Sequence, residues 1–254
     1  MTASPDPSRE LRLHPGWWAR LEGQEFDLEA LTGAVGDRGP VQIRRFDDRY
    51  YLRMAEFDEL NESSDVETRA SEVLPIVNGA ARVEHGDNRE VRVDAAARVQ
   101  PNGQIQHFIH LSGSIHARGR VSATLEVNGE AVPVAPEPTI AERAVGAALN
   151  DPQAERALRI FGRDDVDYRD LYHVFEIAEA SIGSGIYSDG TVTLAEVRRF
   201  KHTANSVHAL GDQARHGHEA TQPPSQPTSF AEAQALVGRV LRVWFADAAN
   251  HHRS

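Results

Sequence analysis

The chain has 254 residues, with 27 Lys and Arg against 38 Asp and Glu, and its formal net charge is −11. This length can bury one large core or two modest ones, and the acidic balance argues against a surface for duplex DNA or an anionic membrane, because phosphates need a basic footprint. The absence of cysteine excludes disulfides, zinc–thiolate sites and cysteine nucleophiles.

No apolar run approaches the length of a membrane-spanning helix. Residues 1–15 are rich in proline, serine and charge and lack the apolar core of a signal peptide, so we expect a flexible tail there. A cytoplasmic protein without membrane association is therefore expected.

The first ordered element is expected at Trp17 and Trp18. Adjacent residues of a strand point to opposite faces, so one indole should enter the core and the other should cover an edge or a second domain. Val41–Phe57 predicts a β-hairpin, with Asp47 and Asp48 as its turn residues.

A helix that contains a proline is predicted after the hairpin. Ser64 and Glu67 have the spacing of a capping box, and apolar residues follow at helical intervals. Pro75 lies inside this pattern, so we expect the helix to kink there or to end just before it. The earlier stretch Glu25–Val35 is compatible with either a strand or a short helix.

The next stretch is typical of strands and tight turns. Glu90–Val99 begins with alternating apolar residues, and Pro101-Asn102-Gly103 predicts a turn before a strand that contains Ile105. A further strand is predicted at Val121–Val127, and the prolines of residues 131–138 are typical of a linker.

Beyond this linker the hydrophobic period changes from two to 3.6, which predicts helices. Residues typical of helix starts recur along this part: Thr139 with Glu142, Asp151 before Pro152, Thr193 with Glu196, and Ser229 with Glu232. The predicted fold class is α+β, with a β-rich N-terminal module over residues 16–136 and an all-α module of four or five helices over residues 139–248.

The segment 191–219 is where we expect a site. It holds the only lysine of the chain and four of its twelve histidines. A single helix here would place five polar side chains on one side, at steps of four, three, four and three: Lys201, Asn205, His208, Asp212 and Arg215. A solvent-exposed face over a core-facing face would give the same spacing and is what a surface helix normally shows. Against that explanation, His, Asn and Asp are poor helix formers and are uncommon choices for an exposed face.

Gly211 interrupts the predicted helix, so either another backbone packs closely there or the helix breaks. Three ligands along one straight helix do not converge on one ion, and Arg215 would repel a cation. We therefore expect no metal and no other cofactor.

General acid–base chemistry suits these side chains better. A histidine can transfer a proton near neutral pH, and a neighbouring lysine or arginine can hold a phosphate, as cleavage of RNA by its own 2′-hydroxyl requires. The candidates for catalysis are Lys201, His208, Arg215 and His216. The candidates for substrate binding are Arg198, Arg199, Asn205 and Asp212. Glu176 and Glu179 are expected to be exposed or to pair with Arg198, Arg199 or Lys201.

The run Ala-Arg-His-Gly stands at residues 214–217, a proline-rich turn comes after it, and the capped last helix contains a tryptophan. In these features the C-terminal part of the chain resembles the HEPN superfamily, in its ApeA-like group. The resemblance covers at most residues 139–245. It implies a metal-independent ribonuclease of bacterial toxin–antitoxin or phage-defence type, with RNA as partner and a homodimer through the helical module. His216-Gly217 matches the end of the family's signature, with Arg215 adjoining it; in a second alignment Lys201 and His208 take the places of arginine and histidine. A non-catalytic interaction or dimerisation module is the alternative.

Overall fold

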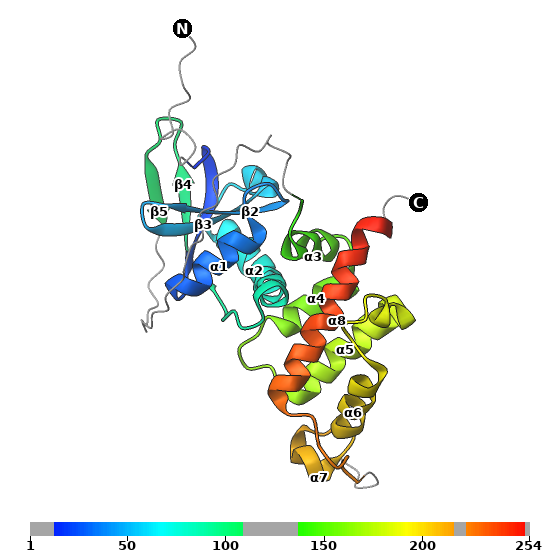
Figure 1. Ribbon diagram of the computed structural model, residues 1–254. Helices are drawn as coiled ribbons and strands as arrows, with labels where there is room; N and C mark the ends of the chain where they lie inside the picture. The colour runs from blue at the N-terminus through cyan, green and yellow to red at the C-terminus, as the bar shows by residue number, and fades with distance from the viewer. Residues whose placement is uncertain (1–12, 109–136, 216–221, 252–254) are drawn as a thin grey trace, which may run out of the picture.

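The computed structural model describes residues 13–108, 137–215 and 222–251 (Figure 1). The predicted strand at 121–127 and His216 lie outside the described residues. The N-terminal half forms an antiparallel sheet in the order β2-β3-β1-β4-β5, and most of the helices follow in the C-terminal half, so the predicted α+β class is confirmed. The sheet lies at one end of the molecule, and α6 and α7 lie at the other (Figure 1).

The strands are β1 (Gly16–Glu22), β2 (Val41–Phe46), β3 (Arg49–Met54), β4 (Arg92–Val99) and β5 (Ile105–Phe108). The helices of the N-terminal half are α1 (Glu25–Val35) and α2 (Ser63–His85), with a 3-10 turn at Ala55–Glu59. The later helices are α3 (Ile140–Ala148), α4 (Pro152–Phe161), α5 (Tyr168–Ile182), α6 (Leu194–Ala204), α7 (Val207–Leu210) and α8 (Phe230–His251), with 3-10 turns at Gly183–Tyr187 and Gly211–Gln213.

The β2–β3 hairpin has the turn that the sequence predicts. Asp47 and Asp48 have φ values of 51° and 56°, and the two-residue hairpin turn that fits the twist of its strands needs positive φ at both positions. Trp17 packs into the main core, whereas Trp18 joins a smaller apolar cluster, so the prediction of two faces is confirmed. The indole N–H of Trp17 donates to the carbonyl of Leu60 at 3.0 Å.

Helix α2 settles one of the two alternatives for Pro75 and corrects the predicted cap. The helix does not end before Pro75 but continues to His85, and a kink at Pro75 stays a prediction. The predicted capping box at Ser64 and Glu67 does not form, because Glu62 is the N-cap and makes no side-chain cap. The carboxylate of Glu67 accepts a hydrogen bond from the backbone N–H of Ala96 in β4 at 2.9 Å instead, so a long-range contact has replaced a local one.

The caps of the later helices agree with the sequence. Capping boxes form at Thr139 with Glu142 and at Thr193 with Glu196, and Asp151 caps the helix that begins at Pro152. The hydroxyl of Ser229 accepts from the N–H of Glu232 at 3.3 Å, and the Glu232 carboxylate accepts from the N–H of Ser229 at 2.8 Å. Five of the described helices in this half have nine residues or more.

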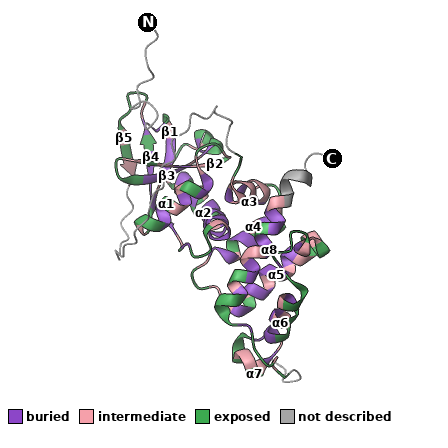
Figure 2. Cartoon of the chain, viewed as in Figure 1, coloured by how far each residue is buried: buried purple, intermediate pink, exposed green. Residues whose placement is uncertain are grey.

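One continuous core joins the sheet to the helices. Buried residues run through α2, α4, α5 and α8 (Figure 2), and α2 packs against β4 on one side and against α3 and α4 on the other. At the crossing of α2 and α4, a Cβ on Gly79 would lie 2.1 Å from the carbonyl oxygen of Leu158, so only glycine permits this approach. The predicted module boundary between residues 136 and 139 stays a prediction.

The guanidinium of Arg82, which is buried, ties α2 to the end of α4. It donates to the carbonyl of Phe161 at 2.8 Å and to the carboxylate of Asp164 at 2.9 Å. Within the described part of the chain, we find no helix with the length and apolar character needed to cross a bilayer.

Candidate functional site

The predicted single helix over the candidate residues is wrong, because the segment folds as three short pieces. Helix α6 ends at Ala204, Asn205 is its C-cap, and Ser206 has an extended backbone with φ −103° and ψ 111°. Asn and Ser favour such breaks because their side chains compete for backbone hydrogen bonds, and here the Asn205 amide donates to the carbonyl of Lys201 at 2.9 Å.

Gly211 ends the one-turn helix α7. Its φ is +56°, and a Cβ at this position would meet nothing within 4 Å, so the glycine marks a break and not a close approach of another backbone. Lys201, His208 and Arg215 therefore do not line one side of one helix.

The chain then folds back along α6. The backbone N–H of Arg215 donates to the carbonyl of Ala204 at 2.8 Å, and Ala214 is buried beside this contact. The guanidinium of Arg169, in the first turn of α5, donates to the carbonyl of Asp212. Because the chain folds back in this way, Arg215 contacts α5. Lys201, which belongs to α6, contacts the same helix.

Lys201 is held by two residues of α5. Its ammonium Nζ lies 2.7 and 2.6 Å from the two carboxylate oxygens of Glu179 and 5.0 Å from the ring centre of Phe175. An ion pair between Glu179 and Lys201 was one of the alternatives predicted from the sequence, and the structure confirms it. The charge of Lys201 is thus neutralised by a carboxylate and lies over an aromatic face.

Arg215 repeats the arrangement about one helical turn away. Its Nη2 lies 2.8 Å from Oε1 of Glu176, and its guanidinium lies 4.9 Å from the ring centre of Tyr172. Nη1 also lies 3.4 Å from the Tyr172 hydroxyl. Burial raises the pKa of Tyr172, while Arg215 opposes that rise, so the phenol stays protonated at neutral pH.

These two ion pairs and the rings beneath them form a defined cluster, which we call the α5 cation site. Its members are Lys201, Arg215, Glu176, Glu179, Tyr172 and Phe175. The four charged side chains are between 32% and 39% exposed, so water and solutes reach them, whereas both rings are buried. Sequence reasoning did not identify the two rings as part of this site.

The remaining candidates are placed separately. Arg199 pairs with Glu232 of α8 at 3.1 Å, Arg198 is exposed on α6, and His208 is exposed on α7. Asp212 is exposed in the 3-10 turn and contributes its carbonyl to Arg169. Among the residues that the structure describes, no group of three or more His, Asp or Glu side chains is arranged to hold a metal ion.

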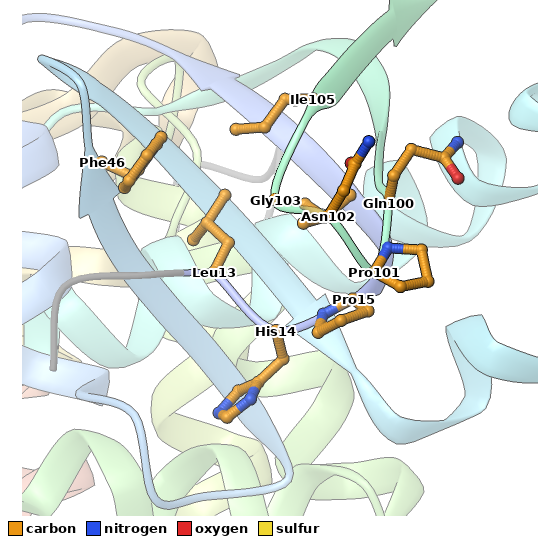
Figure 3. Close-up of a pocket in the computed structure, with 10 residues that line it drawn as sticks. Leu13, His14, Pro15, Phe46, Gln100, Pro101, Asn102, Gly103 and Ile105 are labelled. Atoms are coloured by element: carbon orange, nitrogen blue, oxygen red, sulfur yellow. The ribbon is translucent and has the colours of Figure 1, made fainter. Parts of the chain in front are cut away.

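A concave region that the sequence did not predict lies beside the sheet, at the end of the molecule away from α6 and α7 (Figure 1 and Figure 3). It has a volume of about 520 Å3, and Leu13, Phe46 and Ile105 converge on it from the segment before β1, from β2 and from β5. The turn at 101–103, which the sequence did identify, forms its rim. Its walls are mainly apolar and carry neither cation of the α5 cation site.

No protein-family model matches the chain, and no curated protein and no solved structure is significantly similar to it. The HEPN resemblance therefore stays a prediction.

Proposed function

We propose that the chain is a cytoplasmic HEPN-like protein of bacterial defence or toxin type that binds single-stranded RNA at the α5 cation site. The observation that carries this proposal is the convergence of Lys201 and Arg215 on one face of α5 in a chain whose net charge is −11. An ammonium and a forked guanidinium together suit a phosphodiester, because the first acts as a point charge and the second can bind two oxygens.

The site favours backbone contacts over reading of bases. Phe175 and Tyr172 are buried beneath the cations, so they support Lys201 and Arg215 and leave no ring face for a base to stack on. Two cations neutralise few phosphates, which suits a short single strand better than a duplex surface.

Cleavage would need a proton acceptor near the ribose 2′-hydroxyl. His208 and His216 are the candidates for this role, and His208 is exposed to solvent on α7. Binding and cleavage are therefore separate properties: Lys201 and Arg215 serve the first, and the two histidines serve the second.

One observation favours the second candidate, a non-catalytic interaction or dimerisation module. Glu176 and Glu179 already neutralise both cations. A module of this kind would use the ion pairs to hold α6 and the following turn on α5, and it would leave RNA unbound.

The test is fluorescence anisotropy with a labelled single-stranded RNA, over a range of salt concentrations. Lys201→Ala with Arg215→Ala should weaken binding and reduce the slope of log K against log salt by up to about 1.4, since each phosphate contact on a single strand contributes about 0.7. The matched control is Arg69→Ala with Arg159→Ala, which removes two ion-paired arginines elsewhere. If both double variants lose the same amount of RNA affinity, the net charge of the protein alone explains the loss, and the proposed site is refuted.

Cleavage is tested separately by gel electrophoresis of the same RNA. The His208→Ala and His216→Ala variants should bind RNA as the wild type does, and any cleavage by the wild type should be lost in one of them. Wild-type protein that binds no RNA at low salt would leave the interaction module as the better explanation.

A further inference from the structure

We infer that Glu176 and Glu179 are internal competitors for the RNA phosphates, so that the α5 cation site is closed by its own carboxylates and opens when they are displaced. This inference rests on the proposed function. It concerns how the site is regulated: the cations bind the phosphate, and the two carboxylates that contact them oppose this binding.

The carboxylates occupy donor positions that a phosphate would need. Both oxygens of Glu179 contact the Lys201 ammonium, which has three N–H donors in all. Oε1 of Glu176 contacts Nη2 of Arg215, on the forked end of the guanidinium that binds carboxylate and phosphate oxygens alike. A phosphate can therefore reach these donors only if the carboxylates move.

Other carboxylates near α6 complete helix caps, whereas Glu176 and Glu179 do not. Glu196 completes the cap of α6 and pairs with Arg239 of α8, and Glu232 pairs with Arg199 and completes the cap of α8. Glu176 and Glu179 instead lie inside α5, whose N-terminus is capped by Asp167. Their neutralisation removes no helix cap.

The two ion pairs are accessible enough to be exchanged. The side chains are roughly one-third exposed, and ion pairs of this kind contribute little to stability and are screened by salt. The rings of Phe175 and Tyr172 would keep Lys201 and Arg215 in place after the carboxylates leave, because each cation also contacts an aromatic face. The binding geometry is thus preformed beneath the competitor.

Charge arithmetic gives the expected effect. Two cations and two carboxylates make the site neutral, and replacing both carboxylates by amides raises its charge to +2. The wild type makes these phosphate contacts only when the carboxylates are displaced, so at about 0.7 per contact the slope of log K against log salt should steepen by at most about 1.4. Lowering the salt from 200 mM to 50 mM should then raise the affinity of the variant by up to about sevenfold more than that of the wild type.

The experiment compares Glu176→Gln with Glu179→Gln, combined in one protein, against wild type, using the labelled single-stranded RNA of the previous test. The matched control combines Glu56→Gln with Glu72→Gln, which changes the net charge equally and releases Arg69 at a distant surface. Circular dichroism melts establish that all three proteins are folded. We expect tighter binding and a steeper salt slope for the α5 variant, and a smaller effect for the control.

The outcomes separate the two proposals. Binding by wild type, with no gain in the α5 variant or with an equal gain in the control, overturns the competitor role and leaves RNA binding standing. Absence of binding by all three proteins at 50 mM salt overturns both proposals. Binding by wild type that is clearly tighter in the α5 variant and little changed in the control supports both.

Discussion

The crossing of α2 and α4 gives a sharp prediction for stability. Gly79→Ala would place a Cβ 2.1 Å from the carbonyl oxygen of Leu158 and 2.7 Å from its carbonyl carbon, where ordinary contacts begin near 3.4 Å. Backbone atoms cannot rotate away as a side chain would, so the two helices must separate by more than 1 Å. The separation would also disturb Gly162, whose own Cβ would lie 2.6 Å from the backbone nitrogen of Gly79.

The magnitude follows from two opposing effects. Overpacking in a core costs about 1–3 kcal/mol, and contact with backbone belongs at the upper end. Replacing a helical glycine by alanine stabilises the helix by about 1 kcal/mol, because alanine has the higher helix propensity. The net loss is about 2 kcal/mol, which for a chain of this size lowers the melting temperature by about 4–8 °C.

The matched control is Gly33→Ala in α1. This glycine is also helical and is exposed, and a Cβ there would meet nothing within 4 Å. The same substitution should therefore stabilise the protein by up to about 1 kcal/mol. Urea midpoints followed by tryptophan fluorescence give both values. If Gly79→Ala proves as stable as Gly33→Ala, the helices do not approach as closely as the structure indicates.

Two further predictions concern single side chains. Arg82→Met should cost about 1–3 kcal/mol, because the carbonyl of Phe161 loses its donor while the half-exposed Asp164 can be rehydrated; an unchanged urea midpoint would contradict this. Thr193→Ala should cost about 1 kcal/mol near neutral pH through the lost cap of α6. The Thr193 hydroxyl, followed by the Thr193 backbone N–H and then Arg239, lowers the pKa of Glu196 from its ordinary 4.5, so this carboxylate stabilises the fold above that pH and the contribution disappears as the pH falls. The difference in urea midpoint between Thr193→Ala and wild type should accordingly shrink below pH 4.5, and a difference that is constant with pH would refute the link.

Local signals predicted those parts of the fold whose contacts are local. The β2–β3 turn and the caps at Thr139 and Thr193 each depend on residues within three positions of one another, and all of them are confirmed. The predicted cap at Glu67 failed because its carboxylate binds the N–H of Ala96 in a strand that comes 29 residues later. A spacing rule carries no information about such a partner.

The end of α6 shows the same limit at the candidate site. Asn205 and Ser206 weaken the helix locally, but contacts from further along the chain also hold the break. The N–H of Arg215 binds the carbonyl of Ala204, and the N–H of Thr228 donates to the Thr203 hydroxyl at 2.9 Å. The polar residues could be recognised from the sequence, whereas their placement on α5 depends on this return of the chain.

The α5 cation site also shows why charge changes are the cleaner test of its function. Phe175 and Tyr172 pack against Phe200 with ring centres 5.5 and 5.7 Å apart, and each also lies against a cation. Truncating either ring would remove core packing and the support of the cation together, so a loss of RNA binding in such a variant could not be assigned to either cause. Glutamate-to-glutamine changes keep the side-chain shape, remove the negative charge that faces Lys201 and Arg215, and replace one acceptor oxygen by an NH2 group. A change in binding after these substitutions therefore reports on the electrostatics of the site, separately from the stability of the helices that build it.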